Sequence, residues 1–331
     1  MSKVTLAMVA KEAGVSPSTV SRILNGTAKV HPDKEAGVRA VIERLGFRPD
    51  HAARTLAGGR TSTVGVVTQF IDSPFYGEVL RGIEDELRRE HHVPLFVSGH
   101  WAEAEERACI ELLKERKVDG LILLSSCLSD TALAQVSEDL PVVVTGRRLT
   151  GARLGSLDYD NVAGARAAVE HLLALGHERI AFISGPMHHA DARERLGGYM
   201  AALGVKAHRD PRLIVDADYQ EQGGYDAMLR LLDSGVAFTA VLAANDQMAV
   251  GARLAMYERG LRVPQDVSLV GFDDLYLSRY LTPPLTTVHH SAQTLGVMAS
   301  RQLLGLIRSQ TSAHHVLPTE LRVRASTGPA A

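Results

Sequence analysis

The sequence is poor in cysteine, has no long apolar run, and carries almost no excess of charge of one sign. Its two cysteines, Cys109 and Cys127, form neither a C-x-x-C pair nor a metal-ligand spacing, which argues against a disulfide framework and a zinc site. The apolar run Val4–Ala10 is too short to span a membrane and lacks the context of an export signal. We therefore expect a cytoplasmic protein with no membrane partner.

The charge is unevenly distributed, although its sum over the 331 residues is only −2. Residues 1–60 hold ten Lys or Arg and five Asp or Glu, a balance of +5, whereas residues 61–331 hold the other 26 and 33, a balance of −7. With 45% hydrophobic and 22% charged residues, the chain is globular and long enough for about two domains. The basic N-terminal end can supply contacts to phosphate.

Short β-branched runs alternate with helical patterns from residue 64 to residue 288. The expected strands are Thr63–Phe70, Pro94–Gly99, Gly120–Ser125, Pro141–Gly146, Arg179–Gly185, Ala240–Asn245 and Val267–Asp273. The expected helices lie near residues 76–91, 103–117, 161–175, 191–203, 222–234 and 247–260. This alternation predicts parallel sheets with βαβ crossovers, and the strands are apolar on both faces because helices cover each side.

The number of strands favours two doubly wound lobes with a cleft between them over one large sheet. Ligands of such sheets bind beyond the carboxyl ends of the strands. Those ends are polar here and read Phe70-Ile71-Asp72-Ser73, Ser184-Gly185-Pro186, Ala244-Asn245-Asp246 and Phe272-Asp273-Asp274. We therefore expect a ligand site where they converge.

Residues 1–46 break this pattern and predict three short helices. The first follows the candidate N-cap Thr5 and ends at Gly14, and the second is capped by Ser16 with Pro17 at its first position. The third is expected from about Asp33 to Leu45. Helix, three-residue turn and helix is the geometry that places a second helix in the major groove of DNA.

The residues on the exposed face of the second helix decide between two interpretations of these three helices: a DNA-binding domain and a small helical cap without a partner. Arg22 can bridge O6 and N7 of guanine, and Ser18 and Ser21 can bond bases or phosphate. The ring of Pro17 can meet a thymine methyl group, while Val20 points inward. The chemistry of this face favours DNA binding.

The stretch Ala13-Gly14-Val15-Ser16-Pro17-Ser18-Thr19-Val20-Ser21-Arg22-Ile23-Leu24-Asn25 resembles the DNA-reading signature of the lactose and galactose repressor family (LacI/GalR). Further matches are Gly176-His177-Glu178-Arg179-Ile180-Ala181, Arg195-Leu196-Gly197-Gly198-Tyr199, Asn245-Asp246-Gln247-Met248-Ala249-Val250-Gly251, Gly271-Phe272-Asp273-Asp274 and Pro284-Leu285-Thr286-Thr287-Val288. The resemblance implies an α/β fold: an N-terminal three-helix helix-turn-helix domain, followed by a two-lobed, periplasmic-binding-protein-like effector domain with doubly wound parallel sheets.

The resemblance also implies the domain boundaries. Residues 1–46 form the DNA-binding domain, residues 47–60 a hinge-helix linker, and residues 61–331 the effector-binding and dimerisation core. Within that core, the N-terminal lobe takes about 61–159 plus 290–318, and the C-terminal lobe takes about 160–289 plus 319–331. In the family the linker folds on operator DNA and wedges a leucine into the minor groove, a role that falls to Leu56. An ordinary flexible tether stays the alternative.

The implied DNA contacts come from the helix-turn-helix and the linker. They are Thr5, Ser16, Pro17, Ser18, Thr19, Ser21, Arg22, Asn25, His31, Asp50, Ala53 and Leu56. The implied effector is a sugar or sugar derivative, with no other cofactor and no metal. Its contacts combine polar groups for hydroxyls with aromatic plates, and they are Phe75, Tyr76, Arg147, Arg195, Tyr219, Asn245, Asp273 and His290. Two of these residues also have a structural interpretation: Asp273 could cap a helix, and Phe75 could belong to the hydrophobic core.

One departure from the family concerns charge. Gly146 stands where the lactose repressor has an acid, and Arg147 together with His290 could favour an acidic or phosphorylated sugar. The alternative, which we prefer, is a salt bridge of Arg147 between the lobes. The paired histidines that begin at residues 91, 188, 289 and 314 have no third ligand at zinc spacing, so we expect them on the surface.

No phosphate-loop, dinucleotide-binding, zinc-protease or nucleophile-elbow motif occurs, so we do not expect an enzyme. We expect a homodimeric regulator, most often a repressor in this family, of carbohydrate-metabolism genes, whose affinity for a pseudo-palindromic operator depends on the effector. No leucine heptads follow Arg324, so a tetramer-forming tail is not expected. A periplasmic-type sugar-binding protein would need an export signal. The alternative of a regulator that uses its ligand as a corepressor stays open, because an inducer and a corepressor would occupy the same cleft.

Overall fold

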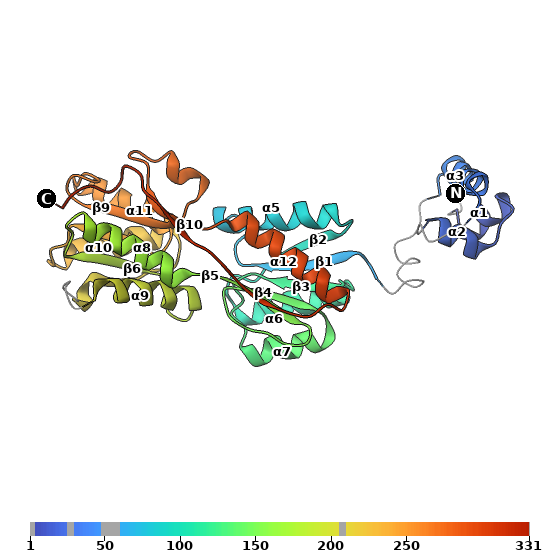
Figure 1. Ribbon diagram of the computed structural model, residues 1–331, viewed down its shortest axis with the longest axis horizontal. Helices are drawn as coiled ribbons and strands as arrows, with labels where there is room; N and C mark the ends of the chain where they lie inside the picture. The colour runs from blue at the N-terminus through green and yellow to red at the C-terminus, as the bar shows by residue number, and fades with distance from the viewer. Residues whose placement is uncertain (1–3, 25–29, 48–59, 205–209, 331) are drawn as a thin grey trace. The chain divides into compact units, whose positions relative to one another are not determined.

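The computed structural model describes residues 4–24, 30–47, 60–204 and 210–330 (Figure 1). The chain divides into two compact units, Met1–Thr61 and Ser62–Ala331, which we call the head and the core. Among the helices of the described residues, none is both long enough and apolar enough to cross a membrane.

Three short helices make up the head. Their bounds are α1 Leu6–Glu12, α2 Pro17–Leu24 and α3 Pro32–Leu45. Thr5 caps α1 by accepting a hydrogen bond from Met8 N at 3.3 Å, and Ser16 caps α2 by accepting one from Thr19 N at 3.2 Å. Helices this short are marginal alone, so they depend on a shared core of Val9, Ala10, Val20, Ile23, Val38 and Phe47. The three helices expected from the sequence are confirmed.

The first lobe of the core, which we call the N-lobe, is built on a six-stranded parallel sheet (Figure 1). In spatial order its strands are β11 (His314–Leu317), β5 (Leu154–Tyr159), β4 (Val142–Thr145), β3 (Gly120–Leu123), β1 (Thr63–Thr68) and β2 (Val93–Ser98). Its helices are α5 (Pro74–Arg89), α6 (Glu103–Glu115), α7 (Asp130–Asp139) and α12 (Ala292–Ile307). The central strands are buried along their whole length because helices cover both faces of the sheet.

The second lobe, the C-lobe, repeats this architecture. In spatial order its strands are β12 (Glu320–Arg322), β10 (Thr286–His289), β9 (Ser268–Asp273), β8 (Ala240–Ala243), β6 (Ile180–Ser184) and β7 (Ile214–Asp216). Its helices are α8 (Asn161–Ala174), α9 (Ala190–Leu203), α10 (Glu221–Asp233) and α11 (Asp246–Glu258), with short 3₁₀ turns η1 (Pro211–Leu213) and η2 (Tyr276–Arg279). The edge strand β12 runs antiparallel to β10, and the other pairs are parallel.

The described chain crosses between the lobes three times, from β5 to α8, from β10 to α12 and from β11 to β12 (Figure 1). The fold class expected from the sequence is confirmed, and so are the seven strands and six helices named above. The sequence did not indicate β5, β7, the three C-terminal strands, or helices α7 and α12. Most of those strands are short and lie at sheet edges, where a buried apolar run is not required.

Candidate functional site

The face of α2 that points away from the core of the head is polar. Pro17, Ser18 and Arg22 are exposed, and Thr19 and Ser21 are half-buried. The hydroxyl of Ser16 lies 2.8 Å from that of Ser18 and 2.8 Å from that of Thr19. An arginine and several hydroxyl groups on one exposed helix face are the groups that bond base edges and phosphates in a major groove.

Two of the remaining residues expected to contact DNA are described, and both are exposed. The hydroxyl of Thr5 accepts from Met8 N, and Nδ1 of His31 lies 3.2 Å from Oδ2 of Asp33. Asn25, Asp50, Ala53 and Leu56 lie outside the described residues. The expected linker helix and its leucine wedge therefore stay predictions.

A cavity lies between the two lobes of the core. It is partly open to solvent and is lined by polar and aromatic side chains of both lobes. Six of the eight residues expected to bind an effector line it, namely Phe75, Tyr76, Arg195, Tyr219, Asn245 and Asp273. The strands that end here bring together side chains that are far apart in the sequence.

A buried group of titratable side chains forms the polar centre of the cavity. Nη1 of Arg195 lies 3.6 Å from Oδ1 of Asp273, and the same oxygen lies 2.9 Å from Nε2 of His290. Nε of Arg195 donates to Oδ1 of Asn161 at 2.9 Å, and the guanidinium lies 3.9 Å from the ring centre of Phe272. Nη2 makes no hydrogen bond with the described residues, so this nitrogen can donate to a ligand.

Burial controls the charges in this group. It raises the pKa of Asp273 to about 7, against the opposing effect of Arg195. Burial, reinforced by Arg195, lowers the pKa of His290 well below its ordinary value, so the imidazole is neutral. His290 is 2% exposed and does not itself line the cavity. It acts behind Asp273, as a hydrogen-bond partner that fixes the carboxyl group.

Asn245 and Tyr219 hold each other in place. Oδ1 of Asn245 caps α11 by accepting from Met248 N at 2.9 Å, and Nδ2 donates to the carbonyl of Tyr219 at 2.9 Å. The amide of Asn245 is therefore largely used in positioning the cavity wall. Tyr219 has a φ of 67°, and its ring lies over Gly185, where a Cβ would come within 2.1 Å of the ring. Only glycine at position 185 leaves room for this ring.

Aromatic rings cover the N-lobe side of the cavity. Phe75 and Tyr76, in the first turn of α5, pack edge to face with ring centres 5.2 Å apart. Phe75 lies 5.6 Å from the ring of His290, and Tyr159 lies 3.9 Å from it. These rings provide apolar faces, while Arg195 and Asp273 on the other lobe provide charge.

The structure corrects the expectations for Arg147. Its Nη1 donates to the carbonyl of Leu128 at 2.7 Å and to Oδ1 of Asp130 at 3.0 Å, and its Nη2 donates to the carbonyl of Ser126. All three partners belong to the N-lobe, so Arg147 neither lines the cavity nor bridges the lobes. The loop before α7 offers two carbonyl oxygens and a carboxylate close at hand, and these hold the guanidinium away from the cavity.

The paired histidines are not all at the surface, as the sequence suggested. His189 lines the cavity and His290 is buried beside it. In both pairs the second histidine lies at the junction of the lobes: His189 lies in the loop between β6 and α9, and His290 directly follows β10, whose last residue is His289. The expectation of surface histidines is therefore wrong for these two.

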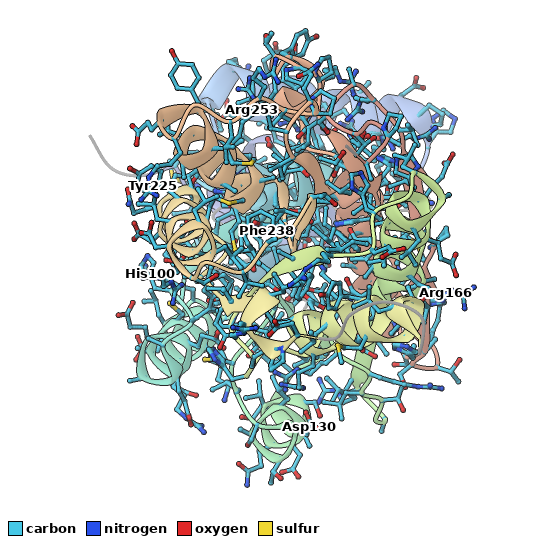
Figure 2. All side chains as sticks on the ribbon, turned by 90° about the vertical axis from the view of Figure 1, so that its left-hand side faces the viewer. His100, Asp130, Arg166, Tyr225, Phe238 and Arg253 are labelled. Atoms are coloured by element: carbon cyan, nitrogen blue, oxygen red, sulfur yellow. The ribbon has the colours of Figure 1, made fainter. Side chains whose placement is uncertain are left out.

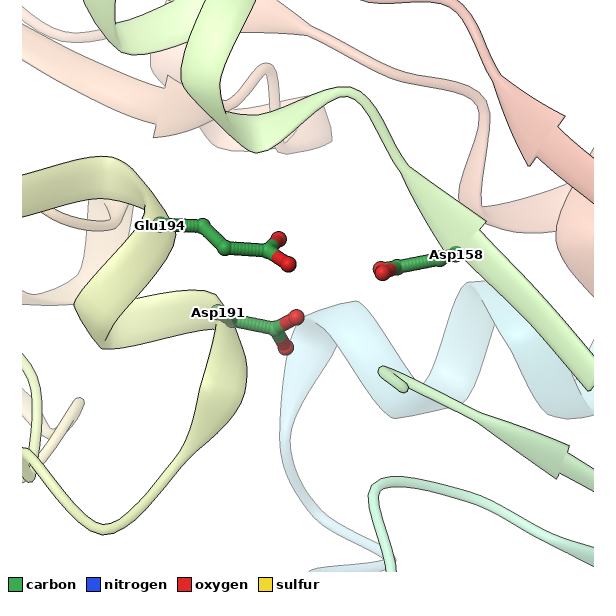
Figure 3. A group of neighbouring side chains, drawn as sticks. All are labelled: Asp158, Asp191 and Glu194. Atoms are coloured by element: carbon green, nitrogen blue, oxygen red, sulfur yellow. The ribbon is translucent and has the colours of Figure 1, made fainter. Parts of the chain in front are cut away.

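Three carboxyl groups meet beside the cavity (Figure 3). Asp158, at the end of β5, faces Asp191 and Glu194 of α9, with oxygens within 4.8 Å of one another. Burial, and then the two neighbouring acids, raise the pKa of Asp158 to about 8. Nδ2 of Asn161 donates to Asp191 at 3.2 Å and to Glu194 at 2.9 Å, which offsets part of their repulsion. Carboxylate oxygens grouped in this way are the kind of ligand that hard cations prefer.

Sequence reasoning missed Asp158, Asp191 and Trp101, which all line the cavity. Asp158 was missed because β5 was not expected. Trp101 closely follows the end of β2, so the strand-end rule could have found it. Asp191 lies in the first turn of α9, beyond the loop after β6, and is not indicated by that rule. Asp191 also reaches the N-lobe: a Cβ at Gly146 would lie 3.4 Å from its Oδ2. The C-lobe thus places an acid in front of the position where the sequence suggested that one was missing.

A helix-turn-helix head joined to a two-lobed core with a polar cavity is the architecture of a ligand-responsive, DNA-binding regulator. Comparison with known proteins agrees. Residues 5–50 match the model for bacterial regulatory proteins of the lacI family, and residues 169–327 match a periplasmic binding protein-like domain.

Named relatives and solved structures cover almost the whole chain. The transcriptional regulator GalR of Escherichia coli is 35% identical over 91% of this chain and 89% of its own. A crystal structure of the lac repressor dimer bound to operator and the anti-inducer ONPF has a TM-score of 0.87 at 30% identity, covering 99% of this chain and 100% of that one. A complex of the regulator CelR with cellobiose has a TM-score of 0.74 at 33% identity, covering 98% and 99%. The chain belongs to the lacI family and is a DNA-binding transcriptional regulator, as the resemblance implied.

Proposed function

We propose that this regulator is a homodimeric repressor whose operator affinity is set by an uncharged carbohydrate bound between the lobes of the core. The observation that carries this proposal is the composition of the cavity. Aromatic rings line the N-lobe side, and a buried Arg195–Asp273 pair lies opposite. A sugar ring needs both, because its C–H face packs on aromatic rings while its hydroxyls need paired donors and acceptors. CelR with cellobiose, a related structure, is consistent with this ligand class.

The charges favour a neutral sugar over a sugar acid or phosphate. Asp158, Asp191 and Asp273 line the cavity, against Arg195 alone among the arginines and lysines of the described lining. Arg147, the group that would have favoured an anion, is bonded within the N-lobe. Burial raises the pKa of Asp158 and of Asp273, so even the carboxyl groups of the protein tend toward their neutral form here. An anionic ligand would have Arg195 as its one cation in the described lining.

An exposed apolar surface supports the homodimer. Val250, Leu254 and Tyr257 recur at helical spacing on α11, with Leu254 51% and Tyr257 76% exposed. Tyr276 and Leu277 of η2 are each 61% exposed. Figure 2 shows the C-lobe, to which α11 and η2 belong, end-on, with Arg253 of α11 and Tyr225 of α10 labelled. Exposed apolar side chains that recur along one helix face are typical of a protein interface. A two-fold dimer would present two copies of α2 to half-sites about one helical turn apart.

The test is thermal unfolding of the full-length protein against galactose, glucose, ribose, cellobiose, galacturonate, glucose 6-phosphate and hypoxanthine. A cavity ligand raises the unfolding midpoint by mass action. We expect a neutral sugar to raise it and the two anionic sugars to leave it unchanged. A response to an anionic sugar alone would contradict the neutral class, and a response to hypoxanthine alone would support a regulator with a purine ligand instead.

A further inference from the structure

Trp101, the single tryptophan of the chain, lies at the cavity and has no role in the expectations from the sequence. It stands between β2 and α6 on the N-lobe and is half-buried. Its ring centre lies 4.8 Å from that of His189 and 6.1 Å from that of Tyr219, both on the C-lobe. The indole therefore reaches from one lobe to the other at the place where a ligand would be enclosed.

A buried polar network holds Trp101 in an uncommon backbone conformation. Its φ is 53° and that of His100 is 50°, in the left-handed region that residues other than glycine seldom adopt. Trp101 N donates to Oε1 of Gln69 at 2.7 Å, and Nε2 of Gln69 donates to Oε1 of Glu106 at 2.9 Å. Gln69 and Glu106 are 0% and 1% exposed. Strain that is stabilised in this way clusters at binding sites, so the position of the indole is a specified feature of the fold.

The rings around this point have polar atoms that the protein does not satisfy. Nε1 of Trp101, Nε2 of His189 and the hydroxyl of Tyr219 are buried and have no hydrogen-bond partner among the described residues. The indole N–H of Trp101 lies near the hydroxyl of Tyr76, but no hydrogen bond of ordinary geometry joins them. Its effect on Tyr76 is small: burial raises the pKa of that tyrosine, and the indole N–H lowers it slightly. Buried polar groups are nearly always paired, so these three point to a bound partner.

His189 is uncharged. Burial, and then the neighbouring His188, lower its pKa to about 4, so at neutral pH its imidazole offers one donor and one acceptor. The rings of Trp101, His189 and Tyr219 thus form an apolar enclosure with neutral hydrogen-bonding atoms. This combination suits a polyhydroxylated ring and offers no cation to an anion.

We propose that Trp101 is a specificity-determining residue of the effector site. Its ring packs against the C–H face of an uncharged sugar, and Nε1–H donates to one hydroxyl of that sugar. His189 and Tyr219 hold the same ligand from the C-lobe. This inference rests on the proposed function, because it requires the effector to be a carbohydrate.

Intrinsic fluorescence tests the contact directly, because all tryptophan emission of the wild-type protein comes from Trp101. The probe is the neutral sugar that raises the unfolding midpoint, titrated into the full-length protein. We expect emission to change saturably, with the Kd that calorimetry gives. The control is Trp101→Phe/Tyr225→Trp, which moves the reporter to α10. Its emission should stay constant up to sugar concentrations that saturate this variant by calorimetry, which excludes a general change of the protein.

Variants separate a ligand contact from a structural role. Trp101→Phe keeps an aromatic plate and removes the donor, so we expect the Kd to rise about tenfold. Trp101→Ala removes both and should raise it about 100-fold. Among monodeoxy analogues of the sugar, the one that lacks the partner hydroxyl should bind the wild type and Trp101→Phe equally well. A structural role would weaken all analogues alike and lower the unfolding midpoint without ligand.

The outcomes that contradict the two proposals differ. Suppose that a neutral sugar raises the unfolding midpoint but does not change the emission of the wild-type protein, and that Trp101→Phe binds this sugar with the wild-type Kd. The role of Trp101 is then wrong, and the carbohydrate effector stands. If no sugar raises the midpoint of the wild-type protein, the carbohydrate class is wrong and the role of Trp101 is rejected with it.

Discussion

The two sides of the cavity differ in chemistry. The N-lobe side is mainly aromatic, with Phe75, Tyr76, Trp101 and Tyr159 beside the single acid Asp158. The C-lobe side carries the Arg195–Asp273 pair, together with Asp191 and the rings of His189 and Tyr219. An aromatic surface discriminates weakly among hydroxyl patterns but binds any sugar face, while a fixed charged pair depends strongly on the position of each hydroxyl. We infer that the rings of Phe75, Tyr76 and Tyr159 supply general affinity, whereas the Arg195–Asp273 pair, together with the N–H of Trp101, selects the ligand. Closure of the lobes would bring the two contributions together on one ligand.

The largest expected effect comes from the charged side. Arg195→Ala removes the cation beside Asp273 and the nitrogen available to a ligand, so we expect sugar affinity to fall at least 100-fold, measured by calorimetry. Arg195→Lys keeps the charge but loses the planar donor set, and should recover only part of the affinity. Full affinity in Arg195→Ala would mean that the C-lobe side does not select the ligand.

A second test displaces an aromatic ring without changing it. Gly185→Ala places a Cβ 2.1 Å from the ring of Tyr219, so the ring must move. We expect a sugar affinity about 30-fold lower and a reduced unfolding midpoint. Gly197→Ala on α9 is the matched control, because nothing lies within 4 Å of the added Cβ. Equal behaviour of the two variants would show that Tyr219 is not held as described.

The aromatic side should give a smaller and less selective effect. Phe75→Leu removes a ring that packs against Tyr76 and His290, and we expect affinity to fall about tenfold. The loss should be similar for two epimeric sugars, whereas Arg195→Lys should change their ratio. If Phe75→Leu lowered the affinity for one epimer much more than for the other, the division between general affinity and selection would be refuted.

The smallest effect concerns stability and pH. The pKa of Asp158 is raised from 3.8 to about 8, so its contribution to stability is present below pH 3.8 and is lost as the pH rises toward 8. Asp158→Asn removes this loss and keeps an oxygen for Tyr159 N, which donates to Oδ1 at 2.7 Å. We expect its unfolding midpoint to exceed that of the wild type by about 2–6 °C at pH 8.5 and to match it more closely at pH 5. The exposed Asp226→Asn is the control, and a gain that does not vary with pH would contradict the raised pKa.

The sequence predicted the parts of the fold that follow from periodicity. Buried apolar strands such as Val142–Thr145 and the capped helices of the head leave clear patterns, and the polar residues after the strands placed Asn245 and Asp273 at the cavity. Strand β5 reads Leu-Gly-Ser-Leu-Asp-Tyr, which shows neither an apolar run nor strict alternation, so Asp158 was not found.

The direction of a long side chain was beyond the sequence. Arg147 follows a strand end, as Asn245 does, yet it turns away because carbonyl oxygens of residues 126 and 128 accept its hydrogen bonds. Those acceptors are set by a loop conformation that no local pattern encodes. Trp101 is the opposite case: its position after β2 was readable, but the backbone conformation and buried glutamine that aim it at the cavity were not.

We expect a carbohydrate between the lobes to set the affinity of the protein for operator DNA. The most direct test is fluorescence anisotropy of a labelled operator, obtained by selection in vitro, with and without the sugar that raises the unfolding midpoint. For the wild type we predict at least a tenfold change in operator affinity on adding the sugar, and for Arg195→Ala no change at the same concentration. Equal operator affinity of the wild type with and without a sugar known to be bound would contradict the account.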